Sequence, residues 1–143
     1  MPASLNRLIY VDDSGRPQSG LVVFGWIEFT PDRWASVLRE WLTLRKSLAR
    51  KYWIPVTQEL HATDYINGRG RISTKFPQEF VHNGQPYWKD LGRAVAVECL
   101  STLASTEGLT VGAVFRHGAP EDVAQTRHTA YSALVRRSRK NWL

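Results

Sequence analysis

The hydrophobic and polar positions of the chain alternate between strand-like and helix-like patterns. Two apolar runs come first, over residues 5–13 and 21–29, and glycine and proline breakers separate them. Continuous apolar runs of this length, rich in β-branched and aromatic residues, predict strands. We expect the first to be buried on both faces and the two to form an antiparallel hairpin. Gly25, inside the second run, predicts a β-bulge.

Helical spacing of apolar residues appears in later segments. Thr30-Pro31-Asp32 combines a capping residue, a proline and an acid, and predicts a helix from there to about Lys51. Arg45 belongs to the solvated face of that helix, and the single cysteine, Cys99, belongs to the apolar face of a later one. The other expected elements are a short extended piece (52–60), an irregular loop (62–86), a helix (87–106), a strand (109–115) and a last helix opening at 118–122.

This order of elements predicts a mixed α/β layer fold, and the length of 143 residues fits one domain spanning 1–143. One cysteine excludes an intramolecular disulfide and a cysteine-rich zinc site. No apolar run approaches the roughly 20 residues of a membrane span, and no charged leader precedes the first strand. We therefore expect a cytoplasmic protein without a membrane partner. The net charge of +6 favours an anionic partner, nucleic acid first.

The first apolar run ends in two adjacent carboxylates, Asp12 and Asp13. Because side chains alternate along a strand, the two point to opposite faces. A carboxylate at the end of a buried strand needs a metal ion, an arginine or water to stabilise it. Asp13 with the following Ser14-Gly15 also suits a simple turn, whereas no turn requires Asp12.

Asp12 and Glu59 are candidate metal ligands, because hard cations such as Mg²⁺ take oxygen ligands and commonly bind through one or two carboxylates. A salt bridge from Glu59 to a lysine or arginine is the alternative. His61 follows Glu59 by two positions, so an extended backbone puts both on one face. It is a candidate ligand, proton shuttle or structural histidine. Asp64 either completes the cluster or caps a turn.

A second feature is the segment Asn67-Gly68-Arg69-Gly70-Arg71, with Lys75 beyond it. Glycines allow close backbone approach, and arginines bind phosphates in a bidentate fork. Arg69, Arg71 and Lys75 are therefore candidate nucleic-acid contacts, and a solvated flexible loop is the alternative. The sequence contains no Walker motif, no G-x-G-x-x-G after a strand and no H-E-x-x-H.

Three motifs together resemble a known family. Tyr-Val-Asp-Asp-Ser-Gly at 10–15 is close to Y-[IV]-D-[DE]-S-G, and Glu-Leu-His-Ala at 59–62 is close to E-L-[HK], with Gly-Arg-Gly at 68–70 beyond. They resemble the family known as domain of unknown function 3800, common in bacteria and their phages. That family is similar to the ribonuclease H-like fold, a mixed sheet whose first strand carries a metal-binding aspartate. The resemblance implies metal-dependent phosphodiester cleavage, with Asp12 as first acid and Glu59 as second.

The resemblance covers the front part of the family's pattern. Members usually continue into another strand and further acids, whereas this sequence ends after a basic stretch at 139–143. The expectation is a truncated form, a fragment that needs a second chain, or a degenerate relative. Asp13 stands where the family more usually has glutamate.

The leading hypothesis is a ribonuclease H-like nuclease of phage or bacterium that uses Mg²⁺ or Mn²⁺. A non-catalytic nucleic-acid-binding module is the second hypothesis. The third is a protein whose open sheet edge pairs with another chain or with its own copy, giving a homo-oligomer. The residues assigned by the leading hypothesis are Asp12, Glu59 and His61 as catalytic groups, Asp12, Glu59 and Asp64 as metal ligands, and Arg69, Arg71 and Lys75 as nucleic-acid contacts.

Overall fold

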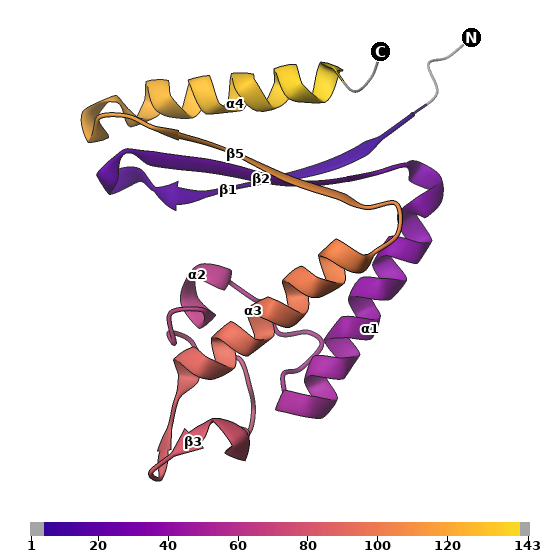
Figure 1. Cartoon of the computed structure of the whole chain (residues 1–143), viewed down its shortest axis with the longest axis vertical. Coiled ribbons are helices and arrows are strands. Elements are labelled where there is room, and N and C mark those ends of the chain that lie inside the picture. Colours follow the sequence, from indigo (N-terminus) through magenta and orange to yellow (C-terminus); the bar gives the residue numbers. More distant parts are fainter. Residues whose placement is uncertain (1–4, 141–143) are drawn as a thin grey trace. The chain divides into compact units, whose positions relative to one another are not determined.

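The computed structural model describes residues 5–140 (Figure 1). The chain divides into two compact units. One combines the segment up to Pro31 with the segment from Leu109 onward, and the other contains Asp32–Gly108. Each unit has its own cluster of buried hydrophobic side chains. Among the described helices, none combines the length and the apolar character that a membrane span needs.

The first unit is a three-stranded antiparallel sheet with one long helix along one face (Figure 1). The strand order is β1-β2-β5, so β2 is central and the other two strands are the edges. The fold is therefore mixed α/β, as the order of elements predicts. The elements of this unit are β1 (Leu8–Arg16), β2 (Leu21–Phe29), β5 (Thr110–His117) and α4 (Val123–Lys140).

The core of the first unit follows from alternation along β2. Val22, Phe24 and Trp26 are buried on one face of the strand and pack with Ala130 and Leu134 of α4. The hairpin between β1 and β2 is confirmed. Its register is continuous, so the bulge predicted at Gly25 is wrong.

The expectation that β1 is buried on both faces is wrong. β1 is an edge strand, and every residue from Tyr10 to Arg16 is exposed. The physical reason is that α4 packs mainly on β2 and β5 and covers little of β1. The turn predicted at Asp13 is also wrong, because the strand continues and the chain reverses in a 3₁₀ turn at Pro17–Ser19.

The second unit contains two long helices packed against each other, a short helix and a small hairpin (Figure 1). The predicted long helices are confirmed, and Cys99 is buried as expected. Leu48, Ile54, Leu91 and Val95 are fully buried at the centre of the core. The elements are α1 (Trp34–Tyr52), α2 (Ala62–Tyr65), β3 (Val81–His82), β4 (Gln85–Pro86) and α3 (Trp88–Ser105).

The segment 62–86, predicted to be irregular, contains α2 and the β3–β4 hairpin, so this prediction is wrong in part.

Gly92 of α3 allows α2 to pack closely against α3. A Cβ at that position would lie 1.8 Å from the carbonyl oxygen of Tyr65. Only a residue without a side chain lets α2 approach α3 this closely.

Arg45 is buried rather than solvated, contrary to the sequence-based expectation. Its Nη2 donates hydrogen bonds to the backbone carbonyls of Pro55 (3.0 Å), Val56 (3.1 Å) and Gln58. The segment that follows α1 has no strand or helix of its own, so these carbonyls need a donor from elsewhere. Arg45 thus stabilises the backbone that leads to Glu59.

The ionisation of Tyr52 makes the free energy of unfolding depend on pH in the alkaline range. Burial, with a hydrogen bond from its hydroxyl to Glu98 (3.0 Å), raises its pKa from 10.0 to about 12. The folded state therefore holds the phenolic proton more tightly than the unfolded chain, and this stabilisation is complete below pH 10 and is lost as the pH rises through about 12. We expect the free energy of unfolding of the native chain to exceed that of Tyr52→Phe at pH 8–10, and the difference to shrink towards pH 12. A difference that stays constant over this range, measured by denaturant unfolding, would contradict the assignment.

Candidate nucleic-acid interface

Asp12 and Asp13 lie on opposite faces of the edge strand β1. Asp12 is exposed opposite Gly25, and its Oδ1 accepts a hydrogen bond from the backbone N–H of Asp13 (3.0 Å). Asp13 lies on the face that carries α4 and forms an ion pair with Arg127 (Nη1 to Oδ2, 2.5 Å). A metal ion, an arginine or water was expected to stabilise these carboxylates, and for Asp13 the partner is an arginine.

A groove of about 660 Å³ lies beside this ion pair in the first unit. Asp12 and Asp13 line it from β1, and Arg127, His128 and Tyr131 line it from α4. The groove exists because α4 covers β2 and leaves the edge strand open. Its lining holds two carboxylates and one guanidinium: Arg127 pairs with Asp13, and within the described residues Asp12 has no ion pair.

Glu59 and His61 lie together in the second unit. Their side chains approach to 3.3 Å (Oε2 to Nε2), and both are well exposed. Asp64, also exposed, lies in α2, where its backbone carbonyl accepts hydrogen bonds from the N–H groups of Asn67 and Arg69. Asp64 thus shapes the start of the loop that follows, whereas Glu59 and His61 form a solvated pair.

The predicted metal ligands do not form a centre within either unit. Asp12 belongs to the first unit, and Glu59, His61 and Asp64 belong to the second. In the described part of the chain, no three histidine, cysteine, aspartate or glutamate side chains gather in a way that could hold a metal ion. Neither unit by itself therefore brings together enough of these ligands to hold Mg²⁺ or Mn²⁺, and the metal site stays a prediction.

The loop from Asn67 to Lys75 lies against the beginning of α3. Gly68 adopts a left-handed backbone (φ +74), and a Cβ there would lie 3.1 Å from the backbone nitrogen of Lys89. A side chain at this position would push the loop away from the helix. The close approach brings the loop against Lys89 at the start of α3, and the two arginines of the loop, Arg69 and Arg71, are exposed.

Two cations of this loop lie over tryptophan rings. The guanidinium of Arg71 is 5.7 Å from the ring centroid of Trp88, and the ammonium of Lys75 is 5.1 Å from that of Trp53. Thr74 fixes the second pair, because its N–H and hydroxyl both donate to the carbonyl of Trp53 (2.9 and 3.1 Å). Cation–π contacts of this kind hold the charged groups in defined positions at the surface.

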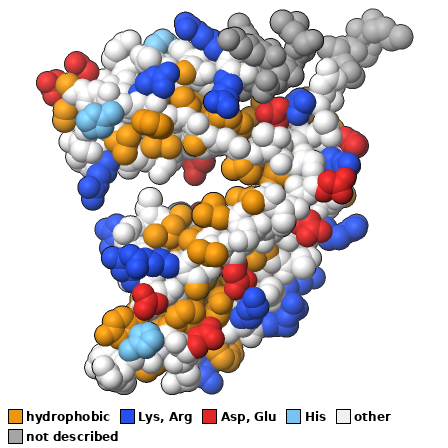
Figure 2. Space-filling view, viewed as in Figure 1, with side chains coloured by type: hydrophobic (Ala, Val, Ile, Leu, Met, Phe, Trp, Pro, Cys, Tyr) orange, Lys and Arg blue, Asp and Glu red, His pale blue; other side chains and the backbone are white. Residues whose placement is uncertain are grey.

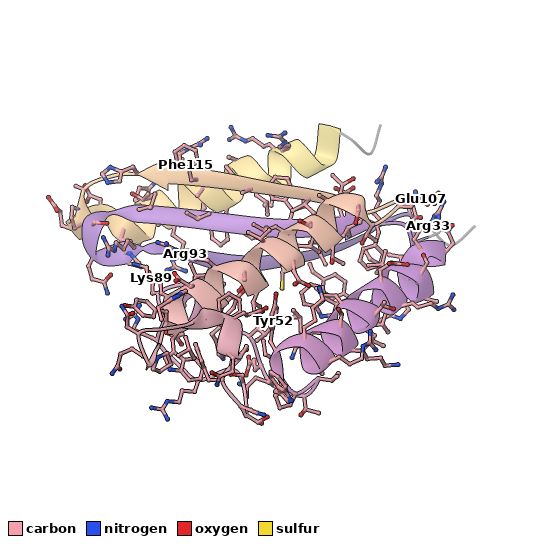
Figure 3. All side chains as sticks on the ribbon, turned by 60° about the horizontal axis from the view of Figure 1, so that its bottom comes forward. Arg33, Tyr52, Lys89, Arg93, Glu107 and Phe115 are labelled. Carbon is pink, nitrogen blue, oxygen red and sulfur yellow. The ribbon has the colours of Figure 1, made fainter. Side chains whose placement is uncertain are left out.

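α3 adds two more cations beside the loop. Lys89 and Arg93 are both exposed, and they stand four residues apart, on one face of the helix (Figure 3). Figure 2 shows lysine and arginine side chains gathered over the part of this unit that α2 and the start of α3 form. We refer to this surface as the basic patch. It comprises Arg69, Arg71, Lys75, Lys89 and Arg93.

The acidic residues near the basic patch are few. The sequence has none between Asp64 and Glu79. Asp90, next to Lys89, lies 3.7 Å from His82 (Oδ2 to Nε2). Within the described residues, none of the five cations of the patch forms an ion pair. Their charge is therefore available to an external anion.

The sequence-based assignment found the loop half of the patch and missed the helix half. Lys89 and Arg93 carry a usable signal, because a spacing of four residues puts them on one side of a predicted helix. Nothing in the sequence indicates that the loop folds back onto that side. Trp53 and Trp88 were likewise missed as the partners of Lys75 and Arg71.

Comparison of the chain with protein family models, with curated proteins and with solved structures finds no match. The function must therefore be inferred from the chemistry of these surfaces.

Proposed function

We propose that this chain is a nucleic-acid-binding domain and that the basic patch binds the sugar-phosphate backbone. The observation that carries this proposal is the seating of the 67–75 loop on α3. It brings the exposed loop cations to the start of α3, which carries the exposed Lys89 and Arg93, while Lys75 lies over Trp53 at the far end of the same loop. Five cations outnumber the two neighbouring carboxylates, Asp64 and Asp90, so the patch attracts a polyanion, and the net charge of +6 adds to that attraction.

The chemistry of the patch suits phosphate groups. The arginines offer bidentate hydrogen bonds to phosphate oxygens, and the lysines act as point charges. Arg71 and Lys75 are already held over Trp88 and Trp53, so they lose less side-chain freedom on binding. Contacts to phosphates carry no sequence information, so the expected binding is independent of base sequence.

Salt dependence tests this proposal. If all five cations contact a single strand, the slope of log K against log salt is about −3.5, and the affinity falls roughly 100-fold between 50 and 200 mM NaCl. The measurement is fluorescence anisotropy of a labelled oligonucleotide, with EDTA present throughout. The absence of binding at 50 mM NaCl, or an affinity independent of salt, would contradict the proposal.

A ribonuclease H-like, metal-dependent phosphodiesterase is the second candidate function. It rests on the family resemblance, and one observation favours it. Asp12, the residue that matches the first acid, is exposed at the groove beside Asp13 and is not in an ion pair within the described residues. Its other assigned groups, Glu59, His61 and Asp64, lie in the second unit.

Asp12→Asn separates the two candidates. Because Asp12 lies outside the basic patch, the variant is expected to bind an oligonucleotide as the native chain does, within about two-fold. Cleavage of that oligonucleotide is measured in the same tubes after addition of Mn²⁺. Cleavage by the native chain that the variant lacks would support the second candidate. Cleavage by both chains, or by neither, would exclude the role assigned to Asp12.

A further inference from the structure

We infer that the basic patch selects single-stranded over double-stranded nucleic acid, by stacking unpaired bases on exposed aromatic rings. The inference rests on the proposed function and adds the form of the ligand. It is carried by the rings that border the patch. Trp53 and Tyr87 are 41% and 46% exposed, although both are large hydrophobic side chains.

Two cations of the patch are each paired with an aromatic ring. Lys75 lies over Trp53, and Arg71 lies over Trp88, which directly follows Tyr87 in the chain. Arg71 and Lys75 are four positions apart, so their Cα atoms lie at most about 14 Å apart. The two cation–ring pairs thus lie within the length of a few nucleotides.

Trp88 and Tyr87 are themselves held in place by neighbouring rings. Phe76 packs edge-on against Trp88 with a centroid distance of 4.7 Å, and His82 packs edge-on against Tyr87 at 4.9 Å. Rings fixed by such contacts lose little freedom when a base stacks on them. Stacking on fixed rings beside a cationic track is how proteins bind single strands without sequence preference.

Charge alone would give the opposite selectivity. Duplex DNA has the higher charge density and releases more counterions per contact than a single strand. A patch that used only its five cations would therefore prefer a duplex. A preference for single strands requires contacts to the bases. The face of a base is accessible to an aromatic ring only when the base is unpaired. Neither stacking nor phosphate contact needs a 2′-hydroxyl, so DNA and RNA strands should both bind.

The experiment compares three probes of one sequence by fluorescence anisotropy at 100 mM NaCl: a 12-nucleotide DNA strand, the same strand in RNA, and the DNA duplex. We expect both single strands to bind at least about ten-fold more tightly than the duplex. Trp53→Ala and Tyr87→Ala should each weaken single-strand binding by roughly ten-fold and should weaken duplex binding far less, because a duplex offers no unpaired base to either ring. Trp53→Phe, which keeps a ring, should restore most of the affinity.

Trp34→Ala is the matched control, because Trp34 is 46% exposed in the same unit but begins α1, whereas Trp53 directly follows it. Circular dichroism confirms that each variant is folded. Equal affinity for strand and duplex, or a loss of affinity in Trp34→Ala as large as in Trp53→Ala, would overturn the inference and leave the proposed function intact. Failure of all three probes to bind would overturn both.

Discussion

Replacing Arg69, Arg71 and Lys75 together with alanine is expected to weaken binding to a single-stranded oligonucleotide by about 100-fold at 0.1 M salt. Each cation lost from the interface means that one phosphate contact fewer releases its counterion. Losing three such contacts makes the slope of log K against log salt shallower by roughly 2. Anisotropy titrations over a range of NaCl concentrations give both quantities. Affinity and slope must fall together if the residues act through phosphate contacts.

The matched control replaces Arg39, Lys46 and Arg50 with alanine. These residues are exposed on α1, and replacing them removes the same amount of charge from the same unit. The control should lose far less affinity than the patch variant. If both triple variants lose affinity equally, binding depends on net charge alone, and the basic patch is not the interface.

Arg45→Met is expected to lower the free energy of unfolding by about 3 kcal/mol. The methionine keeps most of the buried volume, but the carbonyls of Pro55, Val56 and Gln58 lose their shared donor. The segment between Trp53 and His61 can recover those hydrogen bonds only by opening to water. Denaturant unfolding measures the loss, and faster hydrogen exchange in this segment should accompany it.

Arg50→Met provides the comparison for Arg45→Met. Arg50 is exposed near the end of α1, so the same exchange should change stability by less than about 0.5 kcal/mol. A similar loss of stability in the two variants would show that the hydrogen bonds from Arg45 to the backbone carbonyls do not contribute to the free energy of unfolding.

The sequence predicts the long elements well, because their signals are local. The hairpin β1–β2 follows from two apolar runs. The three long helices α1, α3 and α4 follow from helical spacing, with a proline at the start of α1 and α4. The burial of β1 could not be predicted in the same way. An apolar run shows that a strand can be covered, but whether α4 lies over it depends on packing across more than 100 residues.

The candidate site was predictable only in part for the same reason. Arg69, Arg71 and Lys75 stand out because they share one glycine-containing loop. The ion pair of Asp13 with Arg127 joins residues 114 positions apart, and no local signal indicates it. Likewise, a helical pattern cannot distinguish a solvated arginine from one that turns inward to backbone carbonyls, as Arg45 does.

Photo-crosslinking tests whether the basic patch binds single-stranded nucleic acid, because it reports both that binding occurs and where. A single-stranded oligonucleotide that carries 5-bromouracil is bound to the native chain at 50 mM NaCl and irradiated, and the attached peptides are identified by mass spectrometry. We expect crosslinks to Trp53, Tyr87 or Trp88, and an excess of the strand without bromouracil should suppress them. Crosslinks confined to the first unit, up to Pro31 and from Leu109 onward, would contradict it.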